Sequence, residues 1–177
     1  DHLFPQSELV DTLRRTLKGL GIEIDQQPNV LLDLEPRPKK HPRAFCISPD
    51  SPRDVRLVLN PRGGQDDYST LFHEAGHAQF NAHMNPSLSF LYRQYGDTSV
   101  HESYAFLLQH LVEDPVWWHE IMHAEAGEFI RFARFHRLYF LRRYSSKLHY
   151  EVEYYERGGG PALAEAYARW LSQGVEV

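Results

Sequence analysis

The sequence predicts an α+β fold that is mostly α-helical, with a small antiparallel sheet near the N-terminus. Three short apolar runs, broken by proline and charge, lie between residues 29 and 61: "NVLLDLEP", "PRAFCISP" and "DVRLVLNP". From about residue 67 onward, apolar residues recur mainly at helical spacing. The 177 residues are 42% hydrophobic and 13% aromatic, which is enough to form a core. We therefore expect a single domain over 1–177.

The opening segment, "SELVDTLRRTLKGLG", is expected to be a helix because Leu9, Leu13 and Leu17 recur every four residues. Ser7 can cap it, and the two glycines near its end are stop signals. The three apolar runs that follow are expected to be strands, and their short spacing indicates an antiparallel sheet. Either "PRAFCIS" or "DVRLVLN" could be an edge strand that pairs with an extended peptide, or an ordinary strand of the sheet.

The rest of the chain is expected to be helical. The loop "NPRGGQDD" precedes a helix from about Asp67 to about His83, and "DTSVHESYAFLLQHLVED" predicts another that stops before Pro115. A further helical stretch opens at "DPVWWHEIMHAEAGEF" and continues to about Glu156. The glycines of "RGGGP" predict a turn rather than a phosphate-binding loop, because no strand precedes them and no lysine follows. A last helix is expected over about 162–173.

The composition excludes several classes of protein. Lys and Arg total 19 against 24 acidic residues, a net charge of −5, so no basic face for nucleic acid is expected. No apolar run approaches the roughly 20 residues that cross a bilayer. The one cysteine, Cys46, allows neither an internal disulfide nor a thiolate zinc site, and we expect it to be buried packing. This cysteine usage and the lack of a signal peptide fit a cytoplasmic protein, and the start at Asp1 suggests a piece of a longer chain.

The stretch "TLFHEAGHAQF" contains HExxH, a zinc-binding pattern. Residues four apart share one face of an α-helix, so His73 and His77 can direct two imidazole nitrogens at one ion about 2 Å away. Glu74 is rotated by roughly 100° from His73, which is too far for a ligand, and can act as general base on a water at the metal. A catalytic zinc site has three protein ligands, so a third is required.

The third ligand distinguishes this motif from a second copy. "WWHEIMHAEAG" places His119, Glu120 and His123 at the same spacing. After His77 the chain leaves the helix, and Glu102 lies 25 residues later in the first turn of the next predicted helix, from which it can reach the same ion. After the second copy, the next acidic residues stay on the same helical stretch.

The residues between the histidines also differ. Ala75 and Gly76 are small enough to let another element approach the first helix closely, whereas Ile121 and Met122 are typical of a core. Because the chain holds 11 histidines, one accidental copy is credible. We therefore interpret the first copy as the metal site and the second as a coincidence.

At "HEAGHAQF" followed by "VHES", the chain resembles the gluzincin metallopeptidases, most of all relatives of the thimet-type oligopeptidases. The "HES" is also similar to the third-ligand motif of the thermostable zinc carboxypeptidases. The resemblance covers about 30–157. It implies a zincin-like catalytic domain with one Zn²⁺ held by His73, His77 and Glu102. The implied reaction is hydrolysis of peptide bonds in small peptides, with Glu74 as the catalytic residue.

Some residues around this site have two interpretations. The oxyanion of such a reaction needs a donor besides zinc. Candidate donors, each of which could instead belong to the aromatic face of a helix, are Tyr144, His149, Tyr150 and Tyr154. His101 adjoins Glu102 but diverges from it on a helix, so it would support the site from behind or lie at the surface. Asp66 and Asp67 could orient a ligand histidine or only cap the helix.

Two other functions stay open on the sequence alone. One is a zinc-stabilised, non-catalytic helical binding module, in which the ion only joins two helices. The other is a metal-free helical interaction domain. Glu74 separates the enzyme from the zinc-stabilised module, because only hydrolysis requires its carboxylate. Stoichiometric zinc separates both from the metal-free domain.

Overall fold

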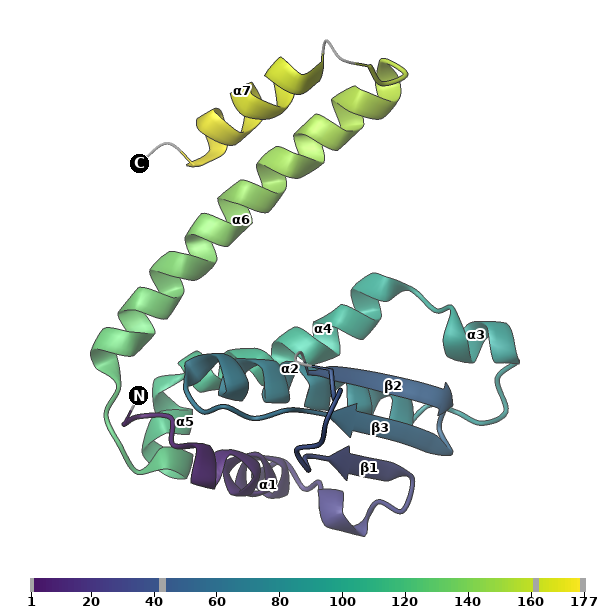
Figure 1. Cartoon of the computed structure of the whole chain (residues 1–177), viewed down its shortest axis with the longest axis vertical. Coiled ribbons are helices and arrows are strands. Elements are labelled where there is room, and N and C mark those ends of the chain that lie inside the picture. The colour runs from purple at the N-terminus through teal and green to yellow at the C-terminus, as the bar shows by residue number, and fades with distance from the viewer. Residues whose placement is uncertain (1, 42–43, 161–162, 176–177) are drawn as a thin grey trace. The chain divides into compact units, whose positions relative to one another are not determined.

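The α+β class with a helical majority is confirmed, since a three-stranded sheet near the N-terminus is followed almost entirely by helices. The computed structural model describes residues 2–41, 44–160 and 163–175. The chain forms two compact units, Asp1–Ala126 and Gly127–Val177 (Figure 1). The expectation of a single zincin-like domain stays a prediction. Among the described helices, none is both long and apolar enough to cross a membrane.

The first unit contains the sheet and most of the helices (Figure 1). Its longer elements are α1 (Leu9–Gly19), β1 (Val30–Asp33), β2 (Phe45–Asp50), β3 (Asp54–Val58), α2 (Gln65–Ala82), α3 (Phe90–Gln94) and α4 (Thr98–Gln109). It ends with α5 (Pro115–Trp117) and a π-helical turn (Trp118–Met122). Short 3₁₀ turns lie at Gln6–Glu8, Ile24–Gln26 and His110–Glu113.

The sheet is mixed, with the strand order β1-β3-β2. β2 and β3 are antiparallel as expected, but β1 pairs with β3 in parallel, so the expectation of a fully antiparallel sheet is wrong for β1. β3, the central strand, is the most buried of the three: its Val55, Leu57 and Val58 are buried. The β2–β3 hairpin therefore meets β1 through β3, and β1 and β2 form the two edges.

α2 is the centre of the first unit, where it contacts β2, β3, α1 and α4. Its aromatic and aliphatic face is fully buried, including Tyr68, Leu71 and Phe72. The three leucines that predicted α1 are buried as well. The helix that carries the first HExxH motif is thus held on several sides, which gives its side chains fixed positions.

α4 approaches α2 closely at Gly76. A Cβ at this position would lie 2.4 Å from the carbonyl oxygen of Tyr104 and 2.5 Å from the Cα of Ala105. Real Cβ atoms do not approach a backbone so closely, so only glycine fits without a shift of α4. The prediction that a small residue between the histidines admits another element is confirmed, and the element is the helix that carries Glu102.

The second unit consists of α6 (Gly127–Glu156) and α7 (Ala164–Val175), which pack against each other (Figure 1). Glu153 of α6 accepts a hydrogen bond from the indole N–H of Trp170 at 2.7 Å. The predicted turn at "RGGGP" is confirmed, since all three glycines have positive φ. The last predicted helix corresponds to α7, although its expected start at Ala162 lies outside the described residues.

Candidate metal centre

Three side chains from two helices converge on one point. His73 and His77 lie one turn apart on α2, and Glu102 lies in the second turn of α4. The two Nε2 atoms are 3.2 Å apart, and the carboxylate oxygens of Glu102 lie 3.5 Å and 3.6 Å from them. Ligands about 2.0–2.1 Å from a tetrahedral zinc ion are about 3.3 Å from one another, so these distances fit. Among the described residues, no other His, Cys, Asp and Glu side chains are grouped in a way that could hold a metal ion.

The ring of His73 is oriented by Gln109, which the sequence analysis did not single out. His73 Nδ1 donates to the amide oxygen of Gln109 at 2.8 Å, and the amide nitrogen of Gln109 donates to Ser69 Oγ at 3.0 Å. A partner on the far nitrogen fixes the tautomer of a metal-binding histidine. The lone pair on His73 Nε2 is thereby directed at the point where His77 and Glu102 meet. The sequence signal that could have identified Gln109 is its spacing, because it lies two turns after Glu102 on the same face of α4.

His77 is the most enclosed of the three residues, with 9% of its surface exposed. Burial lowers the pKa of His77 to about 4; the neighbouring His101 adds to the shift, and the Glu102 carboxylate opposes it. The neutral imidazole is the form that binds metal ions. Its Nδ1 is buried and has no hydrogen-bond partner among the described residues.

Glu74 is held against the edge of the sheet. Its Oε2 accepts a hydrogen bond from the backbone N–H of Cys46, in β2, at 2.7 Å. Its Oε1 makes no hydrogen bond to the described residues and is not sealed from solvent. Burial raises the pKa of the Glu74 carboxyl, and the Cys46 N–H opposes that rise. Burial also raises the pKa of the Cys46 thiol to about 12, so this side chain stays a neutral packing group.

The topology decides between the two candidate edge strands. "DVRLVLN" forms β3, which is paired on both sides, so it cannot accept an added strand. The described part of "PRAFCIS" contains the first four residues of β2, whose outer edge has no partner strand among the described residues. That outer edge presents the Cys46 N–H to Glu74, so the free edge and the candidate metal centre are neighbours.

The second HExxH copy does not assemble into a site. The helical stretch predicted from Pro115 onward is broken: after α5 comes the π-helical turn, and His123 ends that turn with φ of 52°. In a π-helix the hydrogen bonds skip one more residue, so residues four apart no longer lie directly above each other. His119 is exposed and hydrogen-bonded to its own neighbour, Glu120, at 2.9 Å. The interpretation of this copy as a coincidence agrees with the geometry.

The two acidic residues in the first turn of α2 make no hydrogen bond or ion pair with the ligand histidines. Asp67 Oδ2 accepts hydrogen bonds from the backbone N–H groups of Arg62 and Gly63 at 2.5 Å and 2.6 Å. Asp66 is exposed. Asp67 therefore organises the loop that leads into α2, and the alternative in which it orients a histidine is wrong.

His101 contacts the metal-binding side chain of His77, in agreement with the interpretation that it supports the site. Its ring covers that of His77, with centroids 4.2 Å apart and an interplanar angle of 34°. Its Nε2 is 3.1 Å from the amide nitrogen of Asn81, the penultimate residue of the α2 sequence. The ring is half-buried.

The candidate oxyanion donors belong to the second unit, on α6: Tyr144, His149, Tyr150 and Tyr154. His149 stacks on Trp170 with centroids 4.9 Å apart, and Tyr150 contacts the ring of Tyr167 at 5.0 Å. These contacts agree with an aromatic helix face. A role for any of the four in oxyanion stabilisation stays a prediction.

No family model, no curated protein and no solved structure matches the chain. The function is therefore inferred from the candidate metal centre itself. The three residues expected to bind metal, His73, His77 and Glu102, come together at a spacing that could hold an ion. Glu74 lies beside them with one carboxylate oxygen free.

Proposed function

We propose that this protein is a zinc-dependent metallopeptidase that hydrolyses peptide bonds in small peptides. One observation carries the proposal: two imidazole nitrogens and a carboxylate converge at zinc-ligand spacing, with a second carboxylate beside them. In this arrangement His73, His77 and Glu102 hold one Zn²⁺, and Glu74 is the catalytic residue. Three protein ligands leave a fourth position open, as in catalytic zinc sites and unlike structural ones.

A zinc ion bound there would polarise a carbonyl group and lower the pKa of water to about 7. Glu74 receives a proton from the attacking water, because its Oε2 is fixed by the Cys46 N–H while its Oε1 stays open. The same carboxyl group then delivers that proton to the leaving amine. Glu74 is ionised again at the end of the cycle, so a single side chain serves as base and as acid.

The free edge of β2 favours a peptide over other hydrolysable substrates. An extended peptide can add to an unpaired strand edge through its backbone hydrogen bonds, without a particular side-chain sequence. This edge adjoins Glu74 through the Cys46 N–H, so an added peptide would have its backbone next to the base. The resemblance of "HEAGHAQF" and "VHES" to the gluzincins supports the same substrate class.

The test combines metal content with peptide cleavage in wild type, His73→Ala, His119→Ala and Glu74→Gln. Elemental mass spectrometry should find about one zinc in wild type, His119→Ala and Glu74→Gln, and almost none in His73→Ala, because His73 is the only one of the three substituted residues that belongs to the converging group. Cleavage of fluorogenic peptides should be lost in His73→Ala and Glu74→Gln and kept in His119→Ala.

Other outcomes have distinct meanings. If Glu74→Gln keeps both zinc and full activity, the base assignment is wrong. If wild type holds zinc but cleaves no peptide, the ion only joins α2 to α4, as in the non-catalytic binding module. If zinc survives His73→Ala and is lost in His119→Ala, the wrong copy of the motif has been chosen.

A further inference from the structure

A hollow of about 290 Å³ lies beside the candidate metal centre. Its walls are β2, the end of α2, α3 and the start of α4, and they include Ile47, Ser48, Asn81, Arg93, Gln94 and His101. Because β2 is an edge strand, a peptide added to it would run along this hollow. The polar groups that face the hollow can therefore contact the substrate.

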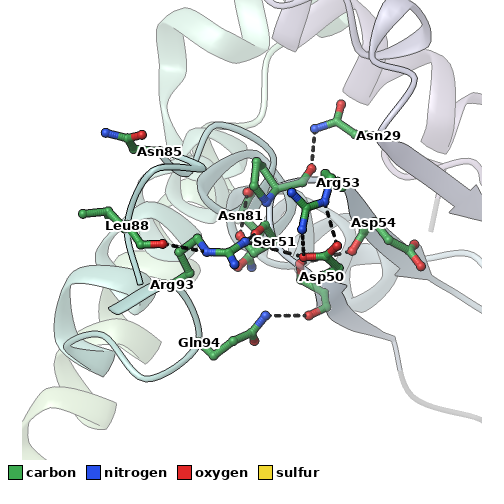
Figure 2. Close-up of polar contacts among 12 residues, drawn as sticks. Asn29, Asp50, Ser51, Arg53, Asp54, Asn81, Asn85, Leu88, Arg93 and Gln94 are labelled. Atoms are coloured by element: carbon green, nitrogen blue, oxygen red, sulfur yellow. Dashed lines mark hydrogen bonds and ion pairs between the residues drawn. The ribbon is translucent and has the colours of Figure 1, made fainter. Parts of the chain in front are cut away.

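Hydrogen bonds and an ion pair join α3, one wall of the hollow, to the end of β2 and the turn after it (Figure 2). These contacts engage the polar side chains of Arg93 and Gln94 on α3. Arg93 donates to the carbonyl oxygens of Ser51 and Leu88 and forms an ion pair with Asp50 at 3.5 Å. Gln94 donates to the carbonyl oxygen of Ser48 at 3.3 Å. The donors of these two side chains thus hold the wall in place, whereas His101, which also lines the hollow, can donate to a ligand.

Asn81 determines the tautomer of His101. The Asn81 amide nitrogen donates to the carbonyl oxygen of His77 at 2.9 Å, and this contact fixes which end of the amide is nitrogen. The same nitrogen lies 3.1 Å from His101 Nε2, so that ring nitrogen must be the acceptor. A neutral His101 therefore carries its proton on Nδ1. Nδ1 has no hydrogen-bond partner among the described residues and, unlike that of His77, it is not sealed from solvent.

We propose that the Nδ1–H of His101 donates a hydrogen bond to a backbone carbonyl of the peptide bound in this hollow, and that Asn81 is the positioning residue that keeps the proton there. The proposal rests on the proposed function. The His101 ring lies against that of His77, so the donor is next to a metal-binding side chain and near the bond to be cleaved. A neutral donor suits a carbonyl oxygen, whose charge increases as the bond is attacked.

Three variants test the role in activity, with a fluorogenic peptide that the zinc-loaded wild type cleaves. His101→Phe keeps a ring against His77 and removes the donor, so kcat/KM should fall about tenfold or more while zinc content stays near one. Asn81→Ala should reduce kcat/KM by a smaller factor, because His101 can then adopt either tautomer. His83→Phe is the matched control: His83 lies outside the hollow, bonded to the Gln79 carbonyl at 2.9 Å, and its loss should leave kcat/KM unchanged.

A second readout does not depend on activity. Long-range ¹H–¹⁵N NMR spectra of histidine-labelled protein report which ring nitrogen carries the proton. Wild type should show His101 protonated on Nδ1, and Asn81→Ala should move the proton toward Nε2, which a free neutral imidazole prefers. Protonation on Nε2 in wild type would overturn the positioning role. Activity of His101→Phe within twofold of wild type would overturn the donor role, whereas a zinc-loaded wild type that cleaves no peptide would overturn the proposed function.

Discussion

The stretch from Thr70 to Phe80 and the stretch from Trp117 to Gly127 both carry HExxH, yet only the first lies on a regular α-helix. In α2 the two histidines share one face, and α4 covers that face with Glu102. In the later stretch the helix becomes a π-helical turn and ends at His123 in the left-handed region. The same five-letter pattern thus leads to a converging group in one place and to scattered side chains in the other.

The spacing of two histidines is therefore only one of the features that make a zinc site. The first copy also has a neighbouring helix at close distance, a third ligand on that helix and a partner for the far nitrogen of His73. The second copy is contacted by α1, but among the described residues no third side chain joins its histidines in a group that could hold a metal ion. The side chain of His119 is 73% exposed against 21% for His73. Each of these differences can be removed or altered by substitution.

The largest effect is expected from Gly76→Ala, which makes the first copy more like the second. The added methyl group would lie 2.4 Å from the Tyr104 carbonyl oxygen, so α4 must move away from α2 and take Glu102 with it. Overpacking against a backbone should lower the free energy of unfolding by about 3 kcal/mol. Zinc binding should weaken below detection in an elemental assay, and urea denaturation should measure the stability.

Gly19→Ala is the matched control for that experiment. Gly19, like Gly76, belongs to an α-helix, as the last residue of α1. A Cβ at Gly19 would meet no atom within 4 Å. The substitution should change stability by no more than about 1 kcal/mol, in the stabilising direction, and leave zinc content intact. Equal stability of Gly76→Ala and wild type would show that close approach of α4 is not required.

Much of this contrast could be predicted from the sequence, because it depends on local pattern. Helical periodicity placed α2 within two residues of its observed ends, and the acid after the intervening loop identified Glu102. Gly76 also carried a readable signal, since glycine between two motif histidines has no local advantage in a helix. These features are properties of one helix or of one short connection.

The features that sequence reasoning missed depend on contacts between distant segments. β1 pairs in parallel with β3 rather than with β2, the next strand along the chain, and the order of the strands in the sequence does not predict this pairing. The π-helical turn follows from packing as well: Trp117 and Trp118 are adjacent in sequence and both buried, which a regular helix face does not favour. The role of Gln109 could not be predicted from its spacing alone, because its contact with His73 depends on the packing of α4 against α2.

A smaller effect is expected from Gln109→Ala, which removes the partner of His73 Nδ1 on the neighbouring helix; His119 Nδ1 has only its sequence neighbour Glu120 as a partner. Without the amide oxygen at 2.8 Å from Nδ1, the His73 ring can rotate and take the other tautomer. Loss of such a partner typically weakens metal binding by about 10- to 100-fold. Titration with a competing zinc chelator measures this affinity directly.

Ser103→Ala is the control on the same helix. Ser103 is exposed and donates only to the carbonyl oxygen of Ser99 at 2.7 Å, one turn earlier in α4. Its removal should leave zinc affinity within about twofold of wild type. If Gln109→Ala behaves in the same way, the orientation of His73 comes from the packing of its ring on Phe106, whose centroid is 5.3 Å away, and not from the amide.

The smallest effect is expected in the second copy, from His123→Gly. His123 has φ of 52° and is exposed, so its side chain adds strain at that φ and little packing. Glycine adopts this conformation freely but loses more entropy on folding, and the net result should be a stabilisation of about 0.5–1 kcal/mol with zinc content unchanged. Urea denaturation, followed by the fluorescence of the adjacent buried tryptophans, measures the change.

His119→Gly is the control: His119 lies within the turn and has no positive φ, so glycine there should instead destabilise the protein by about 1 kcal/mol. If His123→Gly and His119→Gly destabilise the protein equally, the left-handed conformation of His123 is not what ends the turn. The packing of the two tryptophans would then be what prevents a regular helix in the second copy.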